Sequence, residues 1–318
     1  MNAIEIENLS KSFGVGLGLK KAMAVKQLTL NIFEGEVFGL IGPNGAGKTT
    51  TLKMVLGLTH PTSGSIRIFG GDAKEANHRS EIGFLPERPY FYQYLTAIEF
   101  LHFYGQLFGL PTEVREERAR KLLARVGMAN HADTALRKFS KGMLQRMGMA
   151  QALIGDPKLI VLDEPMSGLD PLGRMLIRDI IMDLKKEGRT ILFSSHILSD
   201  VEVICDRIGI LAKGELKEVG TVDTLLHSRV KATEITVMGK ASDLPASVAD
   251  LADSITETPD RVLITVSSDT NKNTINRALL DANVPILALT PRHDSLEDIF
   301  VARLARSEDQ VAKGGAAR

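Results

Sequence analysis

The chain has 318 residues, of which 44% are hydrophobic and 25% are charged, so it can bury a sizeable core in one large and one small domain. Lys and Arg together number 39, as do Asp and Glu, and this balance gives no bulk positive field that would favour nucleic acid. The single cysteine, Cys205, cannot form an internal disulfide, and the first residues lack the pattern of a signal peptide. No run of about 18 apolar residues predicts a membrane span. We therefore expect a cytoplasmic protein, and any role at a membrane would be exerted through a partner.

The first 70 residues predict a β-rich subdomain. Residues 3–9 and 24–32 alternate between apolar and polar side chains, and residues 65–69 give one more strand. Phe13 is predicted to lie on a loop before the glycine-rich residues 14–19. It could stack there on a nucleobase, although an aromatic in this setting is more often a minor core residue.

The stretch that organises the chain is a phosphate loop. Residues 42–49 fit the pattern G-x-x-x-x-G-K-[ST] between a predicted buried strand at 37–41 and a predicted helix at 50–58. The glycines allow backbone N–H groups and the helix N-terminus to point at anionic phosphate. Lys48 would reach the β- and γ-phosphates, and the Thr49 hydroxyl would ligate Mg²⁺.

The periodicity changes from strand to helix within residues 88–155. Helices are predicted at 95–109, 114–126 and 141–154, and Thr96 is a suitable N-cap for the first of them. This segment is therefore a helical subdomain inserted between β-rich parts.

Carboxylates follow the next buried strand. Residues 159–162 are aliphatic, and Asp163 and Glu164 follow them directly, at the end where α/β sheets bind ligands. Taken alone, such a pattern is usually just a strand meeting its loop. Downstream of a phosphate loop it favours Asp163 as a Mg²⁺ ligand and Glu164 as the base that orients and deprotonates the attacking water. His196 ends the predicted strand at 190–194, as a satisfied polar residue or as a group near the γ-phosphate.

Taken in order, these motifs resemble those of the ATP-binding subunit of ATP-binding cassette (ABC) transporters, over about residues 1–225. Residues 167–170 (Ser-Gly-Leu-Asp) match the family's D-loop, and His196 matches its switch histidine. The resemblance implies an α/β P-loop NTPase with a RecA-like core, an antiparallel β subdomain and the helical subdomain. It also implies a dimer that sandwiches two ATP and docks on the cytoplasmic face of separately encoded membrane permeases, most often exporters.

Two segments depart from the family pattern. The signature segment, usually LSGGQ, is Phe-Ser-Lys-Gly-Met at residues 139–143. The resemblance implies that Ser140 and Gly142 contact the γ-phosphate from the opposite subunit, and Ser140 is also a good N-cap. At the Q-loop position Glu87 replaces the family's glutamine. A carboxylate can still ligate Mg²⁺, and Arg88 would offset its charge.

Beyond residue 225 the composition changes, and a small α+β domain is predicted over residues 226–306, followed by a disordered tail at 307–318. The function of this domain cannot be read from the sequence. Its predicted elements are strands at 233–238, 262–266 and 284–289, a helix at 271–282 and a final helix from Ser295.

Aromatic residues are concentrated around the start of the helical subdomain. Eight of the 12 Phe and 4 Tyr in the chain lie within residues 90–108. They either form the core of this subdomain or leave an exposed rim beside Glu87 that receives a permease. The eight are Tyr90, Phe91, Tyr92, Tyr94, Phe100, Phe103, Tyr104 and Phe108; the last four share one helical face and are predicted to be core.

The sequence thus predicts an ATPase that uses ATP and Mg²⁺. Its partners are integral-membrane permease subunits and a second ATPase subunit, identical or related, and no nucleic acid is expected. The alternative is a soluble cassette ATPase acting on nucleic acid or ribosomes; a GTPase or small-molecule kinase is disfavoured because no Asn-Lys-x-Asp motif occurs. The transported substrate is not encoded in a recognisable motif. The expected site residues are Glu164, His196 and Lys48 for catalysis; Phe13, Asn44, Gly45, Ala46, Gly47, Lys48, Thr49, Thr50, Ser140, Gly142 and Asp170 for nucleotide binding; and Thr49, Asp163 and Glu87 for Mg²⁺.

Overall fold

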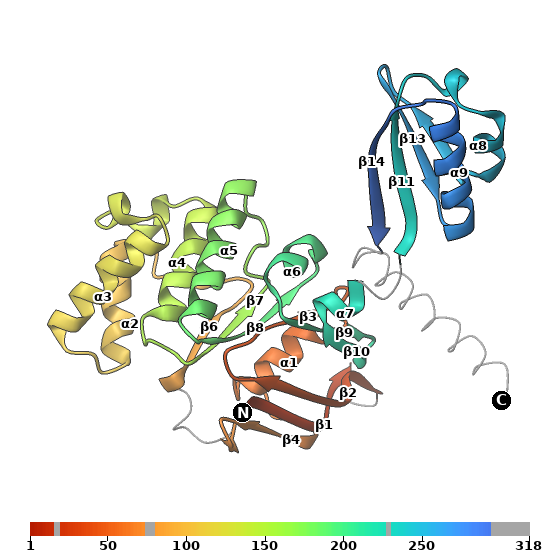
Figure 1. Ribbon diagram of the computed structural model, residues 1–318. Coiled ribbons are helices and arrows are strands. Elements are labelled where there is room, and N and C mark those ends of the chain that lie inside the picture. Colours follow the sequence, from red (N-terminus) through yellow and green to blue (C-terminus); the bar gives the residue numbers. More distant parts are fainter. Residues whose placement is uncertain (16–19, 74–79, 227–229, 294–318) are drawn as a thin grey trace. The chain divides into compact units, whose positions relative to one another are not determined.

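A computed structural model describes residues 1–15, 20–73, 80–226 and 230–293 of the chain (Figure 1). The chain forms two compact units, Met1–Val222 and Asp223–Arg318, whereas the sequence suggests a boundary at residue 225. Each unit is considered by itself below. The predicted final helix from Ser295 and the predicted tail lie outside the described residues.

A six-stranded sheet forms the centre of the first unit. Its strand order is β10-β9-β3-β8-β7-β6, and every neighbouring pair is parallel except β10 with β9. All five residues of β3 and of β7 are buried, as expected for parallel strands covered on both faces. The strands are β3 (Val37–Ile41), β6 (Ile82–Leu85), β7 (Leu159–Asp163), β8 (Thr190–Ser195), β9 (Arg207–Ala212) and β10 (Glu215–Thr221).

Helices cover this sheet on both faces, with α1 (Lys48–Val55) on one side and α5 (Pro171–Lys186) and α6 (Leu198–Ile204) on the other (Figure 1). Side chains of β3 alternate between the two layers. Phe38 belongs to the core shared with α1, whereas a Cβ at Gly39 would lie 2.7 Å from Cys205 Sγ at the end of α6. Burial raises the pKa of the Cys205 thiol well above its usual range, so this half-buried cysteine remains a neutral thiol.

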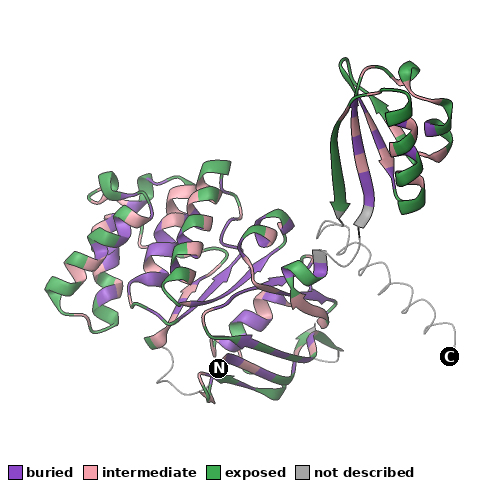
Figure 2. Ribbon diagram, in the orientation of Figure 1, coloured by how far each residue is buried: buried purple, intermediate pink, exposed green. Residues whose placement is uncertain are grey.

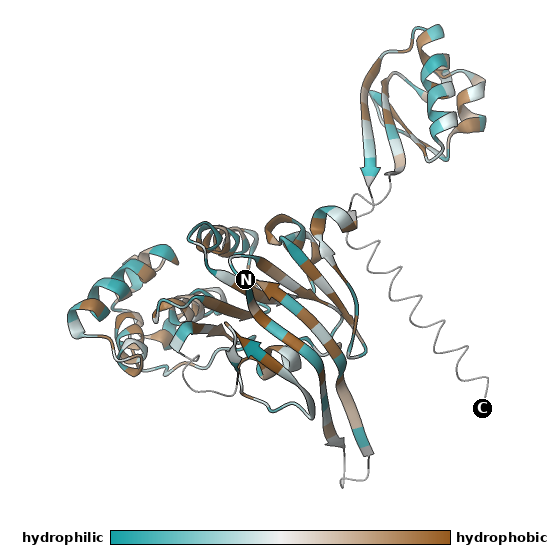
Figure 3. Cartoon of the chain, turned by 60° about the horizontal axis from the view of Figure 1, so that its bottom comes forward, coloured by the Kyte–Doolittle hydropathy of each residue, from teal (hydrophilic) through white to brown (hydrophobic). Residues whose placement is uncertain are grey.

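An antiparallel sheet of order β2-β1-β4-β5 packs on the outer side of α1 and contributes to the same core. Hydrophobic and hydrophilic residues alternate along its long strands, and the buried ones face inward (Figures 2 and 3). The first strand extends well beyond the predicted residues 3–9. Phe13 therefore pairs with Ala22 inside a strand, and its predicted placement on a loop is wrong. The strands are β1 (Asn2–Val15), β2 (Lys20–Phe33), β4 (Ser63–Ile68) and β5 (Gly71–Asp72).

The helical part lies in sequence between β6 and β7. Thr96 is the N-cap of helix α2 as predicted, with a capping box in which Thr96 N–H donates to Glu99 at 2.8 Å. Ser140 caps α4, because Met143 N–H donates to its Oγ at 3.2 Å. The helices are α2 (Ala97–Leu107), α3 (Thr112–Arg125) and α4 (Lys141–Leu153), with 3₁₀ turns η2 (Ala129–His131) and η3 (Leu136–Lys138).

The second unit has the order β-α-β-β-α-β and an antiparallel sheet β12-β13-β11-β14. Alternate residues such as Ile235, Ile264 and Val266 are buried in a core with Ile275 and Leu279 of α9. This order of elements is that of a small α+β domain. Its elements are β11 (Val230–Met238), η4 (Ala241–Asp243), α8 (Ala246–Leu251), β12 (Ser254–Glu257), β13 (Arg261–Val266), α9 (Asp269–Asp281) and β14 (Ile286–His293), and α7 (Val222–Leu226) precedes them.

Candidate nucleotide-binding site

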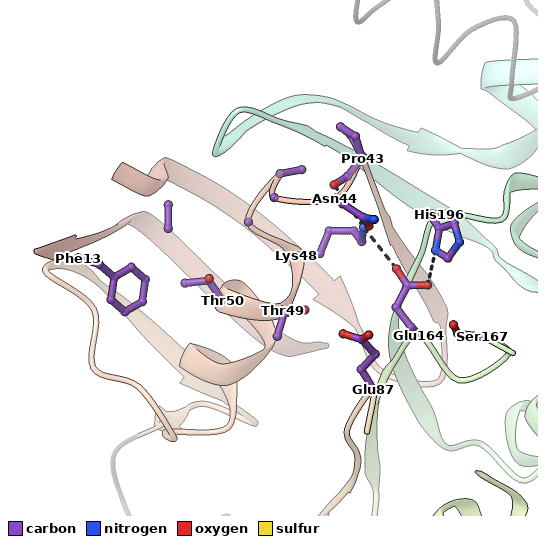
Figure 4. A pocket seen from close by; sticks show the side chains of 14 residues that line it. Phe13, Pro43, Asn44, Lys48, Thr49, Thr50, Glu87, Glu164, Ser167 and His196 are labelled. Atoms are coloured by element: carbon purple, nitrogen blue, oxygen red, sulfur yellow. Dashed lines mark hydrogen bonds and ion pairs between the residues drawn. The ribbon is translucent and has the colours of Figure 1, made fainter. Parts of the chain in front are cut away.

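A cavity of about 620 Å³ opens where β3 meets the N-terminus of α1. Segments distant in sequence converge on it, because the parallel strands β3, β7 and β8 all end at the same edge of the sheet. Figure 4 shows the labelled side chains around it. The described residues that line it are Phe13, Ala24, Pro43, Asn44, Gly45, Ala46, Gly47, Lys48, Thr49, Thr50, Glu87, Glu164, Ser167 and His196.

The loop at residues 42–47 needs glycine at particular positions. A Cβ at Gly42 would overlap the carbonyl oxygen of Leu211, and Gly47 has a φ of 107°, which side chains rarely tolerate. Helix α1 begins directly after it, at Lys48. The N–H groups of the first helical turn have no carbonyl partner within the helix, so this end of α1 suits an anion such as phosphate.

Three charged or ionisable side chains meet at one side of the cavity. The Lys48 ammonium lies 3.4 Å from Glu164 Oε1 and donates to the Gly42 carbonyl at 2.7 Å. His196 Nδ1 lies 2.7 Å from Glu164 Oε2 (Figure 4). The Glu164 side chain is only 10% exposed, and burial of a charged group is costly unless the group is paired and hydrogen-bonded. This arrangement places a carboxylate between a cation and an imidazole, next to the space for phosphate.

Oxygen donors lie beside these groups. Thr49 Oγ1 donates to Asp163 Oδ1 at 3.2 Å, and Ser194 Oγ donates to the same oxygen at 2.6 Å. Mg²⁺ prefers oxygen ligands and is usually held by one or two carboxylates together with substrate phosphates. A hydroxyl and a carboxylate this close, at the edge of a phosphate loop, therefore fit a Mg²⁺ ion that arrives with a nucleotide.

The remaining lining residues lie around these groups. Phe13 is at the far end of the cavity, beyond Thr50, and away from Glu164 (Figure 4), where a ring could face a nucleobase while phosphate lies near Lys48. Glu87 lines the cavity on the side of Thr49 and Glu164. Arg88 was expected to offset the charge of Glu87. Its Nε lies 3.9 Å from Glu87 Oε1 on a side chain that is 92% exposed, so this ion pair is weak.

Comparison with known proteins decides the family. The family model "ABC transporter" matches residues 25–167. The chain is 41% identical to an uncharacterised ABC transporter ATP-binding protein of Nostoc sp., with 98% of this chain and 92% of the relative aligned. It is 36% identical to the bacitracin transport ATP-binding protein BcrA of Bacillus licheniformis, with 94% of this chain and 96% of BcrA aligned. The chain belongs to the ABC transporter family.

Solved structures agree with this assignment. A dimeric ATP-binding cassette bound to ADP and phosphate superposes with a TM-score of 0.64 at 26% identity, and the match covers 69% of this chain and 98% of the cassette. The predicted fold class is confirmed, as is the main prediction of an ATP-binding subunit of an ABC transporter, and nothing favours the alternative of an ATPase acting on nucleic acid or ribosomes. Members of this ABC ATPase family bind and hydrolyse ATP.

Among the helices in the described part of the chain, none combines the length and the apolar character that a membrane span requires.

Three expected nucleotide contacts lie away from this cavity in the single ABC subunit. Ser140 and Gly142 are at the start of α4, and neither lines it. Asp170 caps α5 by accepting from Gly173 N–H at 2.9 Å. Within one chain these residues shape helix ends, so a contact with nucleotide requires a second copy, and it remains a prediction.

Sequence reasoning missed several residues of the site. Ser194 is fully buried, donates to Asp163 and accepts from Glu164 N–H at 3.0 Å. Ser167 lines the cavity, and Gln145 contacts the backbone just after Glu164. For Ser194 a signal was available, because two serines directly precede His196 at the end of a predicted strand.

Replacing Ser194 with Ala should weaken the use of Mg²⁺. The substitution removes the hydrogen bond that orients Asp163, and such outer partners of metal ligands contribute 10- to 100-fold to metal affinity. We expect the Mg²⁺ concentration for half-maximal ATP hydrolysis to rise by about tenfold, as measured by phosphate release. Ser195→Ala is the control, since its hydroxyl bonds to the backbone of Ile197; equal Mg²⁺ requirements in the two variants would contradict the assignment.

Proposed function

We propose that the chain is the ATP-hydrolysing motor of a bacterial ABC exporter and works on the cytoplasmic face of the membrane with separately encoded permease subunits. The observation that carries this proposal is the meeting of Lys48, Glu164 and His196 beside Thr49 and Asp163 at one cavity. These groups supply what phosphoryl transfer to water requires: a cradle for phosphate, a base and ligands for Mg²⁺.

Each group has a stated task. Lys48 and the amides at the start of α1 hold the β- and γ-phosphates. Thr49 and Asp163 would hold Mg²⁺, with Glu87 as a further candidate ligand, and the ion would neutralise negative charge that develops on the phosphates. Glu164 orients a water molecule and accepts its proton as the water oxygen attacks the γ-phosphorus, while the bond from that phosphorus to the β–γ bridging oxygen breaks and ADP leaves. His196, 2.7 Å from Glu164, fixes the carboxylate and lies where it can donate to a phosphate oxygen.

A second ATPase subunit would complete the site. Ser140 N-caps a 13-residue helix, and its hydroxyl and the helix N-terminus provide donors suited to a γ-phosphate of another copy. The superposing cassette that carries ADP and phosphate is dimeric. We infer that ATP draws two subunits together, with Ser140, Gly142 and Asp170 of each facing the nucleotide of the other.

We infer export as the direction of transport. BcrA of Bacillus licheniformis is a bacitracin transport ATP-binding protein aligned over almost the whole of both chains, including the C-terminal unit. We infer a related task for this chain, namely movement of a compound chosen by the permease.

The surface that would receive the permease is an apolar groove of about 470 Å³ beside β6 and α2. Exposed aromatic and aliphatic side chains gather there: Tyr90 is 80% exposed and Leu107 is 67% exposed. Pro86 lines this groove and the next residue, Glu87, lines the nucleotide cavity. The groove and the nucleotide cavity are therefore lined by consecutive residues. This proximity suits a surface that transmits nucleotide binding to a membrane partner, which would insert a short apolar helix into the groove.

The aromatic residues at 90–108 divide into buried and exposed ones differently from the sequence prediction. Phe91 is buried and its ring centroid lies 5.1 Å from that of Phe100, and Tyr92 packs on Phe103 at 5.3 Å. Phe103 and Phe108, which were expected in the core, are more than a third exposed. The exposed rim is thus provided by Tyr90 and Tyr94 rather than by all four aromatics that precede α2.

Lys48→Ala tests the proposed ATPase. The variant should lose at least about a hundredfold in ATP hydrolysis, because it removes the cation that holds the phosphates. Lys53→Ala on the same helix, at an exposed position, should hydrolyse ATP at the parent rate. A Lys48→Ala protein as active as the Lys53→Ala protein would overturn the proposal.

A second variant tests the docking groove. Changing Tyr90 and Leu107 together to Ser should leave ATP hydrolysis by the free subunit unchanged, since neither lines the nucleotide cavity. The amount of the protein that co-purifies with its permease from membranes should fall sharply. Leu58→Ser, at a residue that is 62% exposed outside the groove, is the matched control. Normal association of the double variant would show that the permease binds elsewhere.

A further inference from the structure

The first two turns of α4 contact residues 165–169, the segment that follows Glu164. Gln145 is only 4% exposed, and its Nε2 donates to the carbonyl oxygen of Pro165 at 3.2 Å. Nothing in the catalytic scheme uses this buried side chain. It connects the helix that begins at Ser140 with the turn that carries Glu164.

That turn is strained and depends on support from outside. Glu164 has a φ of 51°, a left-handed conformation that is uncommon for a non-glycine residue, and a proline follows it, which favours an extended conformation instead. Such a conformation persists when its surroundings fix it. Two side chains do so here: Ser194 Oγ accepts from Glu164 N–H at 3.0 Å, and Gln145 donates to the Pro165 carbonyl.

The same helix touches the segment at two further points. The Lys141 side chain lies directly over Gly168, so that a Cβ at this glycine would overlap its ammonium end. A Cβ at Gly142 would be in ordinary contact with Leu169, at 3.5 Å from its Cδ2. Residues 165–169 are therefore packed against the start of α4.

We propose that Gln145 is a positioning residue for Glu164, and that through it the start of α4 sets the placement of the base in its own subunit. The inference rests on the proposed function, in which Glu164 activates water and Ser140 meets the nucleotide of a second copy. Contact of Ser140 with that nucleotide would then be felt at Glu164 of the same chain. Each of the two ATP sites would thereby influence the other through one hydrogen bond.

Gln145→Met tests this, because methionine keeps the length of the side chain and removes the donor. We expect kcat for ATP to fall by about tenfold, while KM for ATP and the melting temperature stay close to the parent values, since Lys48 and the phosphate loop are untouched. Gln151→Met, on the same helix and away from the nucleotide cavity, should leave kcat unchanged. An unchanged kcat in Gln145→Met, or an equal loss in Gln151→Met, would overturn the proposal.

Gln145→Glu separates the hydrogen bond from packing. Burial raises the pKa of a carboxyl group, and the protonated carboxyl can donate to the Pro165 carbonyl whereas the ionised form cannot. The ratio of its kcat to that of the parent should therefore rise as the pH falls from 8 to 6, and the ratio for Gln145→Met should stay constant. Ratios that are constant for both variants would contradict the role of the donor. A parent protein that folds but does not hydrolyse ATP would instead refute the proposed function itself.

Discussion

The buried carboxylate of Glu164 constrains the rest of the site. A carboxylate that is 10% exposed must be compensated, and Lys48 and His196 provide this from two other segments of the chain. For these groups to meet, the phosphate loop, the end of β7 and the end of β8 must lie together. The parallel register of β3, β7 and β8 places them there.

The meeting of these segments also requires particular backbone conformations. Gly42 and Gly47 allow the loop to approach β9 and β2 closely before α1 begins. On the other side, Glu164 takes a left-handed conformation that hydrogen bonds from Ser194 and Gln145 support. Backbone strain at the turn that carries the base is common at catalytic positions.

The sequence was sufficient for the parts of the fold that have a strong local pattern. The strands at residues 37–41 and 159–163 and the N-cap at Thr96 were predictable, because continuous apolar runs, glycine-rich turns and capping residues are local signals. Phe13 was misplaced because the strand β1 continues past a polar stretch whose pairing with β2 is a long-range contact. The role of Gln145 could not be assigned for a similar reason, and the two serines before His196 did not by themselves identify the partner of Ser194, since the partners of Ser194 and Gln145 lie 31 and 20 residues away in sequence. The burial of Phe91 and the exposure of Phe103 depend on how α2 packs against its neighbours, which helical spacing alone does not specify.

The claim on which this account depends most is that Glu164 is the base of a site shared between two subunits. Glu164→Gln keeps the shape of the side chain and removes the group that accepts the proton. In size-exclusion chromatography with ATP and Mg²⁺, this variant should elute as a dimer that retains uncleaved ATP, and without nucleotide as a monomer, with hydrolysis reduced by about a hundredfold or more. A variant that binds ATP but stays monomeric, or that hydrolyses ATP at the parent rate, would contradict the account.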